Sequence, residues 1–321
     1  DFLIGTHALF QKNIHFNKLG LIIIDEQHKF GVQQRIRFAK KGGINCDVLL
    51  LSATPIPRTM MMSIYGDMDN SRLEEKPKQR QKILTLSKPE SKINELWPFL
   101  EKKIKNGEQI FWVCPLIEDS KKLDYSSTAK TFKLANKKFA GKVGFIHGEL
   151  NQEEKEKVLK KFLDNKISIL VSTTVIEVGV DFPNATLIII ENSNKFGLAQ
   201  LHQLRGRVGR GSKPGTCILL FKNQLSQNAR KRIQILKLSD DGFYIAEEDM
   251  KLRGYGDIIG FKQSGMKLFK IADPIHHEKL FKIAEENINN LSINKLNNPK
   301  YEFLLKLFDK VDLIDEERVS S

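Results

Sequence analysis

Two adjacent acids follow an apolar run near the start of the chain, in Leu21-Ile-Ile-Ile-Asp25-Glu26-Gln27-His28. Parallel α/β sheets bind ligands at the carboxyl ends of their strands. An aspartate there can hold Mg²⁺ on the β- and γ-phosphates of a nucleotide, and the adjacent glutamate can orient and deprotonate a water. Gln27 and His28 could then report the state of the phosphates. Two acids alone fit a solvated strand end equally well, and the Gln-His pair in register favours catalysis.

Three arginines fall within six residues in Gln203-Leu-Arg-Gly206-Arg207-Val-Gly-Arg210. The spacing predicts that Arg207 and Arg210 share one face of a helix and point together at a transferring γ-phosphate. Gln203 is expected one turn earlier on the same side. A basic solvated helix face is the alternative, but the two glycines weaken a helix and are tolerated where close approach matters.

Small hydroxyl residues follow another apolar run, in Leu51-Ser-Ala-Thr-Pro55. Ser52 and Thr54 could hydrogen-bond the acids and transmit a movement between parts of the protein. A helix N-cap before Pro55 is the alternative. The position of this stretch, shortly after the acids, favours coupling.

The stretch Val171-Ser-Thr-Thr-Val-Ile-Glu-Val-Gly-Val-Asp181 predicts a strand end, a short helix and a Gly-x-Asp turn. Thr173 and Thr174 suit contacts with a DNA phosphate. Gly179 and Asp181 are candidates for nucleotide binding, because Asp181 could accept a hydrogen bond from a ribose hydroxyl. A strand-to-helix cap is the alternative interpretation.

Two further pairs, Thr6-His7 and His147-Gly148, follow predicted strands and fit backbone contacts to one DNA strand. His147 by itself would more often be a structural histidine.

Seven short apolar runs must position these residues. Each is β-rich and apolar on both faces, as central parallel strands are. The runs are Gly20–Ile24, Val48–Leu51, Ile110–Val113, Val143–Ile146, Ile167–Val171, Leu187–Ile190 and Cys217–Phe221. Helical patterns separate them, and Asn151-Gln-Glu-Glu154 predicts a capping box at the start of one helix. Strand and helix in alternation predict open α/β sheets.

The polar stretch Glu74–Gln81 predicts a linker between two α/β lobes. Strand signals stop after Phe221, where two helices over 224–239 and 243–252, a glycine-rich loop over 253–257 and an amphipathic helical tail are expected. The expected domains are 1–80, 81–223, 224–274 and 275–321.

The composition is typical of a soluble globular protein, with 40% hydrophobic and 28% charged residues. No apolar run approaches the ~20 residues of a membrane span, and no signal peptide opens the chain, so a cytoplasmic protein without a membrane partner is expected. Three widely spaced cysteines predict buried thiols. A net charge of +13 suits a polyanionic partner such as DNA, although genome composition is another cause of the lysine excess.

Four of these stretches, DEQH, SATP, STTVIEVGVD and QLRGRVGR, resemble motifs II, III, V and VI of the second helicase superfamily. The chain resembles more closely the RecG family of bacterial branched-DNA helicases. The matching stretches span residues 5–265 and are GTHALFQ, IIIDEQHKFGVQQR, LSATPIPRTM, YGDMD, WVCPLIEDS, VSTTVIEVGVDFPNATLIIIEN, FGLAQLHQLRGRVGRG and LRGYGDIIGFKQSG. The Mfd family of transcription-repair coupling factors is the alternative, but it usually has Glu at the position of Gln27 and Asn at that of Asp257.

The resemblance implies two RecA-like lobes, the first incomplete, followed by a helical hairpin, a loop and a helical tail. It implies that ATP and Mg²⁺ bind between the lobes, with Asp25 and Glu26 on one side and Asp181, Arg207 and Arg210 on the other. It also implies a bacterial, monomeric motor that remodels stalled forks and Holliday junctions without regard to DNA sequence.

Arg232, Arg253 and Gln263 resemble the TRG motif that the RecG and Mfd families share. The resemblance implies that they convert lobe motion into movement along duplex DNA. Arg232 and Arg253 are expected on or after the hairpin helices, and Gln263 on the loop that follows.

Two features depart from the family pattern. The sequence holds no Gly-x-x-x-x-Gly-Lys-Ser/Thr phosphate loop, since Gly141-Lys142 is followed by valine, and it holds no wedge domain. An N-terminally incomplete chain would explain both, and this chain alone is then expected to have negligible ATPase activity. A non-enzymatic DNA-binding module without a phosphate loop is the alternative.

Overall fold

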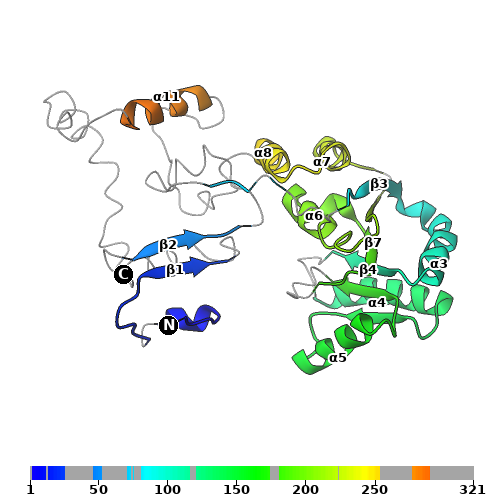
Figure 1. Cartoon of the computed structure of the whole chain (residues 1–321). Helices are drawn as coiled ribbons and strands as arrows, with labels where there is room; N and C mark the ends of the chain where they lie inside the picture. The colour runs from blue at the N-terminus through cyan, green and yellow to red at the C-terminus, as the bar shows by residue number, and fades with distance from the viewer. Residues whose placement is uncertain are drawn as a thin grey trace, which may run out of the picture. The chain divides into compact units, whose positions relative to one another are not determined.

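The computed structural model describes residues 2–11, 14–25, 46–52, 71–73, 75, 81–115, 121–173, 181–222, 224–253 and 277–289 (Figure 1). The chain divides into two compact units. Unit 1 comprises Asp1–Gly66 and Phe269–Ser321, and unit 2 comprises Asp67–Leu268.

Unit 1 holds a pair of parallel strands, which start in register at Leu21 and Asp47. Its described elements are the 3₁₀ helix η1 (His7–Phe10), β1 (Leu21–Ile24), β2 (Asp47–Leu50) and α11 (Glu278–Asn289). Ile22 and Ile24 are buried on one face of the pair. Both strands lie within one residue of the predicted ranges, and α11 confirms a helix in the first part of the tail.

Unit 2 contains a six-stranded parallel sheet with the strand order β3-β8-β7-β4-β6-β5. The strands are β3 (Leu84–Pro89), β4 (Gln109–Cys114), β5 (Val143–Ile146), β6 (Ile169–Thr173), β7 (Ala185–Ile190) and β8 (Thr216–Phe221). Every residue of β4 and β7 is buried. Runs that are apolar on both faces therefore form the centre of the sheet, as predicted.

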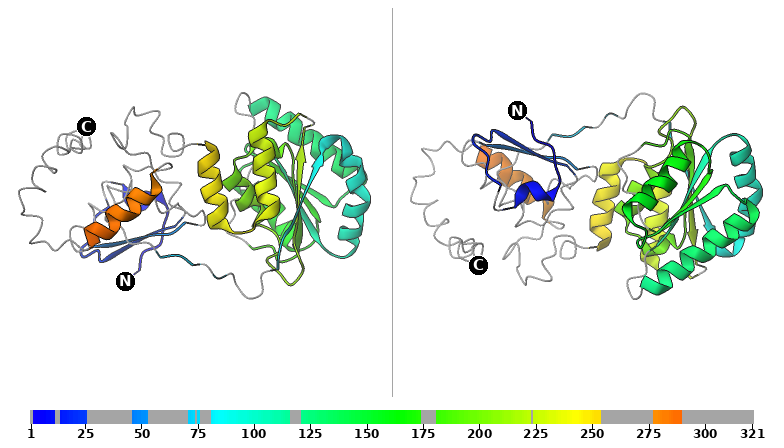
Figure 2. Two further views of the ribbon diagram at one scale, coloured as in Figure 1. Left: turned by 90° about the horizontal axis from the view of Figure 1, so that it is seen from above. Right: turned by 90° about the horizontal axis from the view of Figure 1, so that it is seen from below.

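Helices cover both faces of this sheet (Figure 2). One face packs against α3 (Trp97–Lys105) and α4 (Lys121–Lys138), with η3 (Glu90–Leu96) before them; the other packs against α5 (Gln152–Leu163), α6 (Leu198–Arg205), α7 (Gln227–Leu238) and α8 (Gly242–Arg253). The short η4 (Ser193–Lys195) joins β7 to α6. Strand residues alternate between the two cores: Phe111 and Val113 contact the α5–α8 layer, whereas Trp112 contacts the α3–α4 layer.

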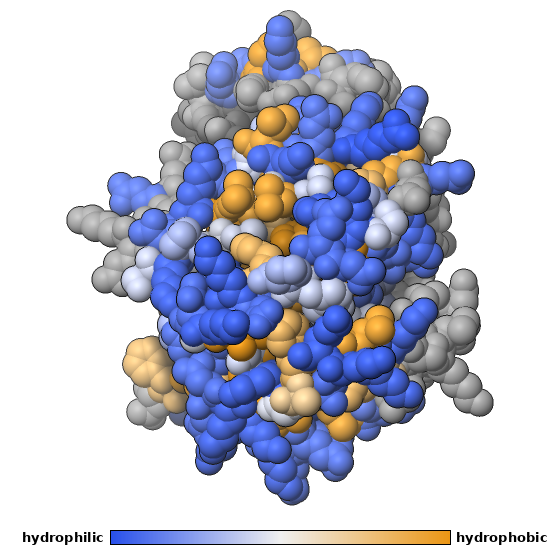
Figure 3. All heavy atoms as spheres, turned by 90° about the vertical axis from the view of Figure 1, so that its right-hand side faces the viewer, coloured by the Kyte–Doolittle hydropathy of each residue, from blue (hydrophilic) through white to orange (hydrophobic). Residues whose placement is uncertain are grey.

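Local sequence signals explain how several helices begin. The Asn151 side chain accepts a hydrogen bond from the Glu154 backbone N–H at 2.8 Å, and the Glu154 carboxylate accepts one from the Asn151 N–H at 3.0 Å. This confirms the predicted capping box. Ser226 caps α7 with a single bond, in which its hydroxyl accepts a hydrogen bond from the Ala229 N–H at 3.2 Å. Figure 3 shows that the face on the right-hand side of Figure 1 is mostly hydrophilic.

The structure adds one strand to those predicted and confirms the parallel α/β class. β3 has the sequence LTLSKP, in which polar residues and a proline conceal the strand signal. It lies at the edge of the sheet, where such residues are tolerated. Helices α7 and α8 confirm the two helices expected after Phe221. The domain boundaries stay predictions, and the linker and the glycine-rich loop fall mostly outside the described residues.

Two of the three cysteines are buried as predicted, Cys114 and Cys217, whereas Cys46 is only half-buried. Burial raises the pKa of the Cys217 thiol to about 12, so it stays protonated. Among the helices that the structure describes, none is long and apolar enough to cross a membrane.

Candidate active site

Asp25 and Ser52 follow two neighbouring parallel strands of unit 1. Asp25 comes directly after β1, and Ser52 comes two residues after β2, with the Leu51 N–H hydrogen-bonded to the Ile24 carbonyl at 2.8 Å. The carboxyl ends of parallel strands meet at one edge of a sheet, so both residues lie at the edge where such folds bind ligands.

Four other predicted residues of this unit, Glu26, Gln27, His28 and Thr54, lie outside the described residues. Thr6 caps η1, since its hydroxyl accepts a hydrogen bond from the Ala8 N–H at 3.5 Å. His7 is the first residue of η1.

Unit 2 contains a pocket that brings together three of the predicted residues, Asp181, Arg207 and Arg210. It encloses about 360 Å³ of space, part of it open to solvent. Its other lining residues are apolar and come from β4, β7, α6 and the segment before β7: Phe111, Val113, Phe182, Ile188 and Leu204. An apolar pocket with a few convergent polar groups is the usual form of a small-molecule site.

The two pocket arginines differ from the prediction in one respect, because they do not lie on a helix. Helix α6 ends at Arg205 and is followed by Gly206, and the residues to Arg210 form a turn. Gly209 has a φ of +69°, which favours glycine and ends helical geometry. The helix prediction was therefore wrong for Arg207 and Arg210, and Gln203, which does lie on α6, is not among the residues that line the pocket.

The turn that carries the arginines is tightly held. The Gly209 N–H donates to the Ala185 carbonyl at 3.2 Å. A Cβ on Gly209 would lie 3.2 Å from the Gly215 nitrogen, and a Cβ on Gly211 would lie 2.5 Å from the Pro183 carbonyl oxygen. The glycines of this stretch thus permit close backbone approach, which fixes the turn against the sheet.

Arg210 makes two polar contacts at the pocket. Its Nη1 is ion-paired with the Asp181 carboxylate, and its Nε donates to the Gly206 carbonyl at 3.1 Å. These contacts hold the guanidinium at the rim, where an anionic ligand could reach it. Gly179, the other predicted nucleotide contact, lies outside the described residues.

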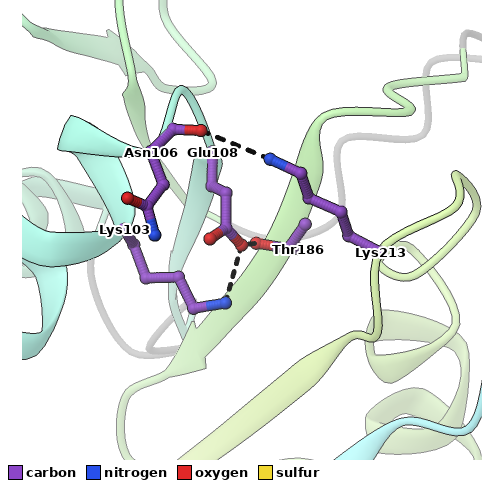
Figure 4. Close-up of polar contacts among 5 residues, drawn as sticks. All are labelled: Lys103, Asn106, Glu108, Thr186 and Lys213. Atoms are coloured by element: carbon purple, nitrogen blue, oxygen red, sulfur yellow. Dashed lines mark hydrogen bonds and ion pairs between the residues drawn. The ribbon is translucent and has the colours of Figure 1, made fainter.

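The loop beyond Arg210 is anchored beside the segment that leads into β4, at the amino ends of the strands (Figure 4). Lys213 Nζ donates to the Asn106 carbonyl at 3.3 Å. Beside it, the buried Glu108 carboxylate is ion-paired with Lys103 at 2.6 Å and accepts a hydrogen bond from Thr186. Burial raises the pKa of Glu108, but these two contacts outweigh burial and the pKa is lowered.

The predicted DNA contacts of unit 2 share the carboxyl edge of its sheet. His147 and Gly148 directly follow β5, and Thr173 ends the neighbouring β6. Among the residues that the structure describes, no atom lies within 4 Å of a Cβ built on Gly148. The His147 ring lies 4.7 Å from that of Phe145. Thr174 lies outside the described residues.

Of the three residues that resemble the TRG motif, Arg232 is described in full. It lies on α7, and its guanidinium donates to the carbonyls of Phe196 at 2.7 Å and Asn194 at 3.2 Å, in the segment that leads into α6. Arg253 is the last residue of α8, and Gln263 lies outside the described residues.

Sequence reasoning missed a buried polar cluster around Glu191, which directly follows β7. Its carboxylate accepts hydrogen bonds from Trp112 Nε1 at 2.8 Å and Thr131 Oγ1 at 3.0 Å, and Cys114 Sγ lies at 3.6 Å. Burial raises the pKa of Glu191, although these hydrogen bonds oppose the shift. A lone acid at the end of an apolar strand was the available signal. Among the described residues, no group of three or more His, Cys, Asp or Glu side chains could hold a metal ion.

The parallel sheet with helices on both faces, together with the two arginines at a pocket, places unit 2 in the class of RecA-like helicase lobes. Residues 91–212 match the family described as "Helicase conserved C-terminal domain", and residues 239–313 match "ATP-dependent DNA helicase RecG, domain 3, C-terminal". The chain belongs to the RecG family of helicases.

Curated RecG helicases from several bacteria match nearly the whole chain. The Bacillus subtilis protein is 43% identical over 324 residues, which cover 100% of this chain and 47% of that protein. The Thermotoga maritima protein is 44% identical over 302 residues, covering 94% and 38%. The chain thus spans about half, or less, of the length of these relatives.

Two solved structures are similar to the chain. A RecG bound to a three-way DNA junction matches with a TM-score of 0.65 and 43% identity, covering 87% of this chain and 35% of that one. The Saccharomyces cerevisiae Dbp5 L327V structure with RNA and ADP BeF3 matches with a TM-score of 0.51 and 18% identity, covering 77% and 65%. At that identity, the second match supports the RecA-like fold alone.

Proposed function

We propose that this chain is the motor portion of an ATP-dependent DNA helicase that remodels branched DNA, as in stalled forks and Holliday junctions. The observation that carries the proposal is the pocket of unit 2, which Asp181, Arg207 and Arg210 line together. Two guanidinium groups there suit a transferring phosphoryl group, whose negative charge they would stabilise.

In this proposal the chain's own residues divide the work on ATP. Arg207 and Arg210 donate hydrogen bonds to the γ-phosphate, and Asp181 accepts one from the ribose. Asp25 supplies a carboxylate oxygen for Mg²⁺, which ATP-using enzymes bind through one or two carboxylates and the phosphates themselves. A single exposed aspartate at a strand end fits that requirement, and the ion would neutralise phosphate charge. Glu26 orients the water.

The proposal assigns DNA to the carboxyl edge of the unit 2 sheet. Thr173 and the backbone at His147 and Gly148 contact phosphates, so binding is blind to sequence. Hydrolysis removes the γ-phosphate, and with it the interaction that favours one conformation of the motor over the other. Arg232 and Arg253 transmit that conformational change to the segment that contains Gln263. The three residues thereby convert it into movement of the motor along duplex DNA.

The test uses the intact protein, by which we mean the complete gene product that contains these 321 residues. We expect it to hydrolyse ATP in a DNA-stimulated manner and to unwind a synthetic three-way junction, with linear duplex as the control substrate. ATP turnover that DNA does not stimulate, together with an intact junction, would contradict the proposal. The proposal also includes that the protein is cytoplasmic and monomeric. Sedimentation of the purified protein tests whether it is a monomer.

A further inference from the structure

Helix α6, which leads into the arginine turn, is held at both ends by the two helices that follow the sheet. At its start, the Leu198 N–H donates to Asp249 Oδ1 of α8 at 3.2 Å. At its end, Arg205 Nη1 donates to the carbonyls of Leu236 at 2.6 Å and Ser239 at 2.8 Å, at the end of α7. One side chain thus anchors each end of the helix.

Both anchoring side chains are buried: Arg205 is 3% exposed and Asp249 is 7% exposed. Charged side chains are almost never buried this deeply unless they are paired. The second nitrogen of Arg205, Nη2, lies 2.9 Å from His202 Nδ1, and Nη1 also lies 3.5 Å from Thr85 Oγ1. The N–H groups of the Arg205 guanidinium are therefore directed to partners inside the protein.

Arg205 differs in this way from the other two arginines of the same stretch. Arg207 and Arg210 line the pocket, whereas Arg205 is not among the lining residues. The sequence pattern groups all three together, but burial and hydrogen bonding separate them into two arginines that line the pocket and one that is hydrogen-bonded within the fold.

The geometry ties the place of the pocket arginines to Arg205. The turn begins at Gly206, immediately after the anchored end of α6, and the Gly209 N–H binds the sheet at the Ala185 carbonyl. Arg207 lies between these two fixed points. A shift of α6 along its axis would move Arg207 relative to the sheet, and misplacement by about 1 Å can cost ~100-fold in rate.

We propose that Arg205 and Asp249 are positioning residues, which hold α6 so that Arg207 and Arg210 meet a γ-phosphate. This inference rests on the proposed function and adds a requirement to it. Hydrolysis depends on two buried side chains that do not touch the nucleotide.

The test compares Arg205→Lys and Asp249→Ala with wild type in the intact protein. Lysine keeps the charge but loses the fork that reaches two carbonyls, and alanine removes the acceptor for Leu198. We expect kcat for DNA-stimulated ATP hydrolysis to fall ~10–100-fold. Affinity for ADP, which lacks the γ-phosphate, and the melting temperature should stay close to wild type.

Two further variants sharpen the result. Asp249→Asn keeps an oxygen acceptor for the Leu198 N–H and should recover most of the activity that Asp249→Ala loses. Glu247→Ala removes an exposed acid from the same helix and should leave turnover unchanged. If Arg205→Lys proves too unstable to purify, the Asp249 pair carries the test alone.

Wild-type kcat in the Arg205→Lys and Asp249→Ala variants would overturn the proposal. So would a fall in kcat that is matched by falls in ADP affinity and melting temperature, since that pattern reports a general loss of structure. A wild-type protein without DNA-stimulated hydrolysis would overturn the proposed function, and this inference with it.

Discussion

The Arg210 guanidinium is ion-paired with the Asp181 carboxylate at the rim of the unit 2 pocket. The arginine side chain is 34% exposed and the aspartate side chain 68% exposed. Ion pairs as exposed as this one contribute ~0–1 kcal/mol. Arg210 can therefore exchange Asp181 for a phosphate at little cost, while the Gly206 carbonyl keeps its Nε in place.

We expect Arg210→Ala to abolish ATP hydrolysis by the intact protein while largely sparing DNA binding. Loss of an arginine that stabilises phosphoryl transfer costs ~10³–10⁵-fold in rate. Steady-state phosphate release and DNA binding by fluorescence anisotropy measure the two properties. Arg230→Ala, an exposed arginine on α7, is the matched control. Unchanged turnover in Arg210→Ala would refute the arginine assignment.

Arg232→Ala should uncouple the motor of the intact protein. The variant loses the two hydrogen bonds that join α7 to the segment before α6, whereas no pocket residue changes. We expect junction unwinding to fall at least ~10-fold more than ATP turnover does, since an interaction of 1.4 kcal/mol already corresponds to tenfold. The exposed neighbour Lys231→Ala serves as control. Equal loss of both activities would argue against coupling.

Glu191 should make the stability of the chain fall as pH rises. Its pKa in the folded chain is raised by burial above the usual 4.5, so the folded state binds this proton more tightly than the unfolded state. The resulting stabilisation is fully present below the usual pKa and is lost as pH rises through the folded pKa.

Urea unfolding of the chain, followed by tryptophan fluorescence from pH 4 to about 8, measures that slope. Glu191→Gln should flatten it, whereas the exposed Glu149→Gln should leave it as in wild type. An unchanged slope in Glu191→Gln would show that the carboxyl does not titrate in this range.

Glu108 should have the opposite effect. Its lowered pKa means that the folded state favours the carboxylate, so the stabilisation is present above the usual pKa and is lost as pH falls through the folded pKa. Glu108→Gln should destabilise the chain by about 1–3 kcal/mol at neutral pH, because a charge-assisted contact to Lys103 is lost. The difference from wild type should shrink at acid pH. A constant difference would contradict the ion-pair explanation.

DNA binding by the chain should weaken steeply with salt, since each phosphate contact releases counterions and the logarithm of affinity falls linearly with the logarithm of salt concentration. Thr173→Ala should weaken binding to all sequences alike. Ser168→Ala, just before the opposite end of the same strand, is the control. A flat salt response would count against phosphate contacts.

The purified chain should also show negligible ATP turnover, because its sequence holds no phosphate loop.

The sequence predicted the parallel sheet well, because strands such as β4 and β7 are apolar at nearly every position and few other elements have that pattern. β3 was missed, since an edge strand needs fewer apolar residues. The arginine turn was expected as a helix because spacing alone cannot show where a helix ends. Gly206 and Gly209 indicate an interruption of the helix, but only the backbone conformation shows that Gly209 has a positive φ.

The site was predicted as a list of residue types, and burial was the part that sequence could not supply. Arg205 and Arg207 are both arginines two positions apart, yet one is fully committed to interior carbonyls and the other lines a pocket. The burial of Glu191 could not be predicted from the sequence for the same reason. The partners that hold it come from two elements, up to 79 residues away along the chain.

The edge strand β3 pairs along its whole length with β8, so Leu84 meets Thr216 and Pro89 meets Phe221. Among the described strands of this sheet, β3 is synthesised first and β8 last. β3 can therefore form its hydrogen bonds to β8 only after all the other strands have been synthesised. Closing so long a loop is slow, and nascent chains that end before β8 will carry β3 as an unsatisfied segment. Completion of this lobe during synthesis is thus tied to the moment when the residues just beyond the arginine turn emerge.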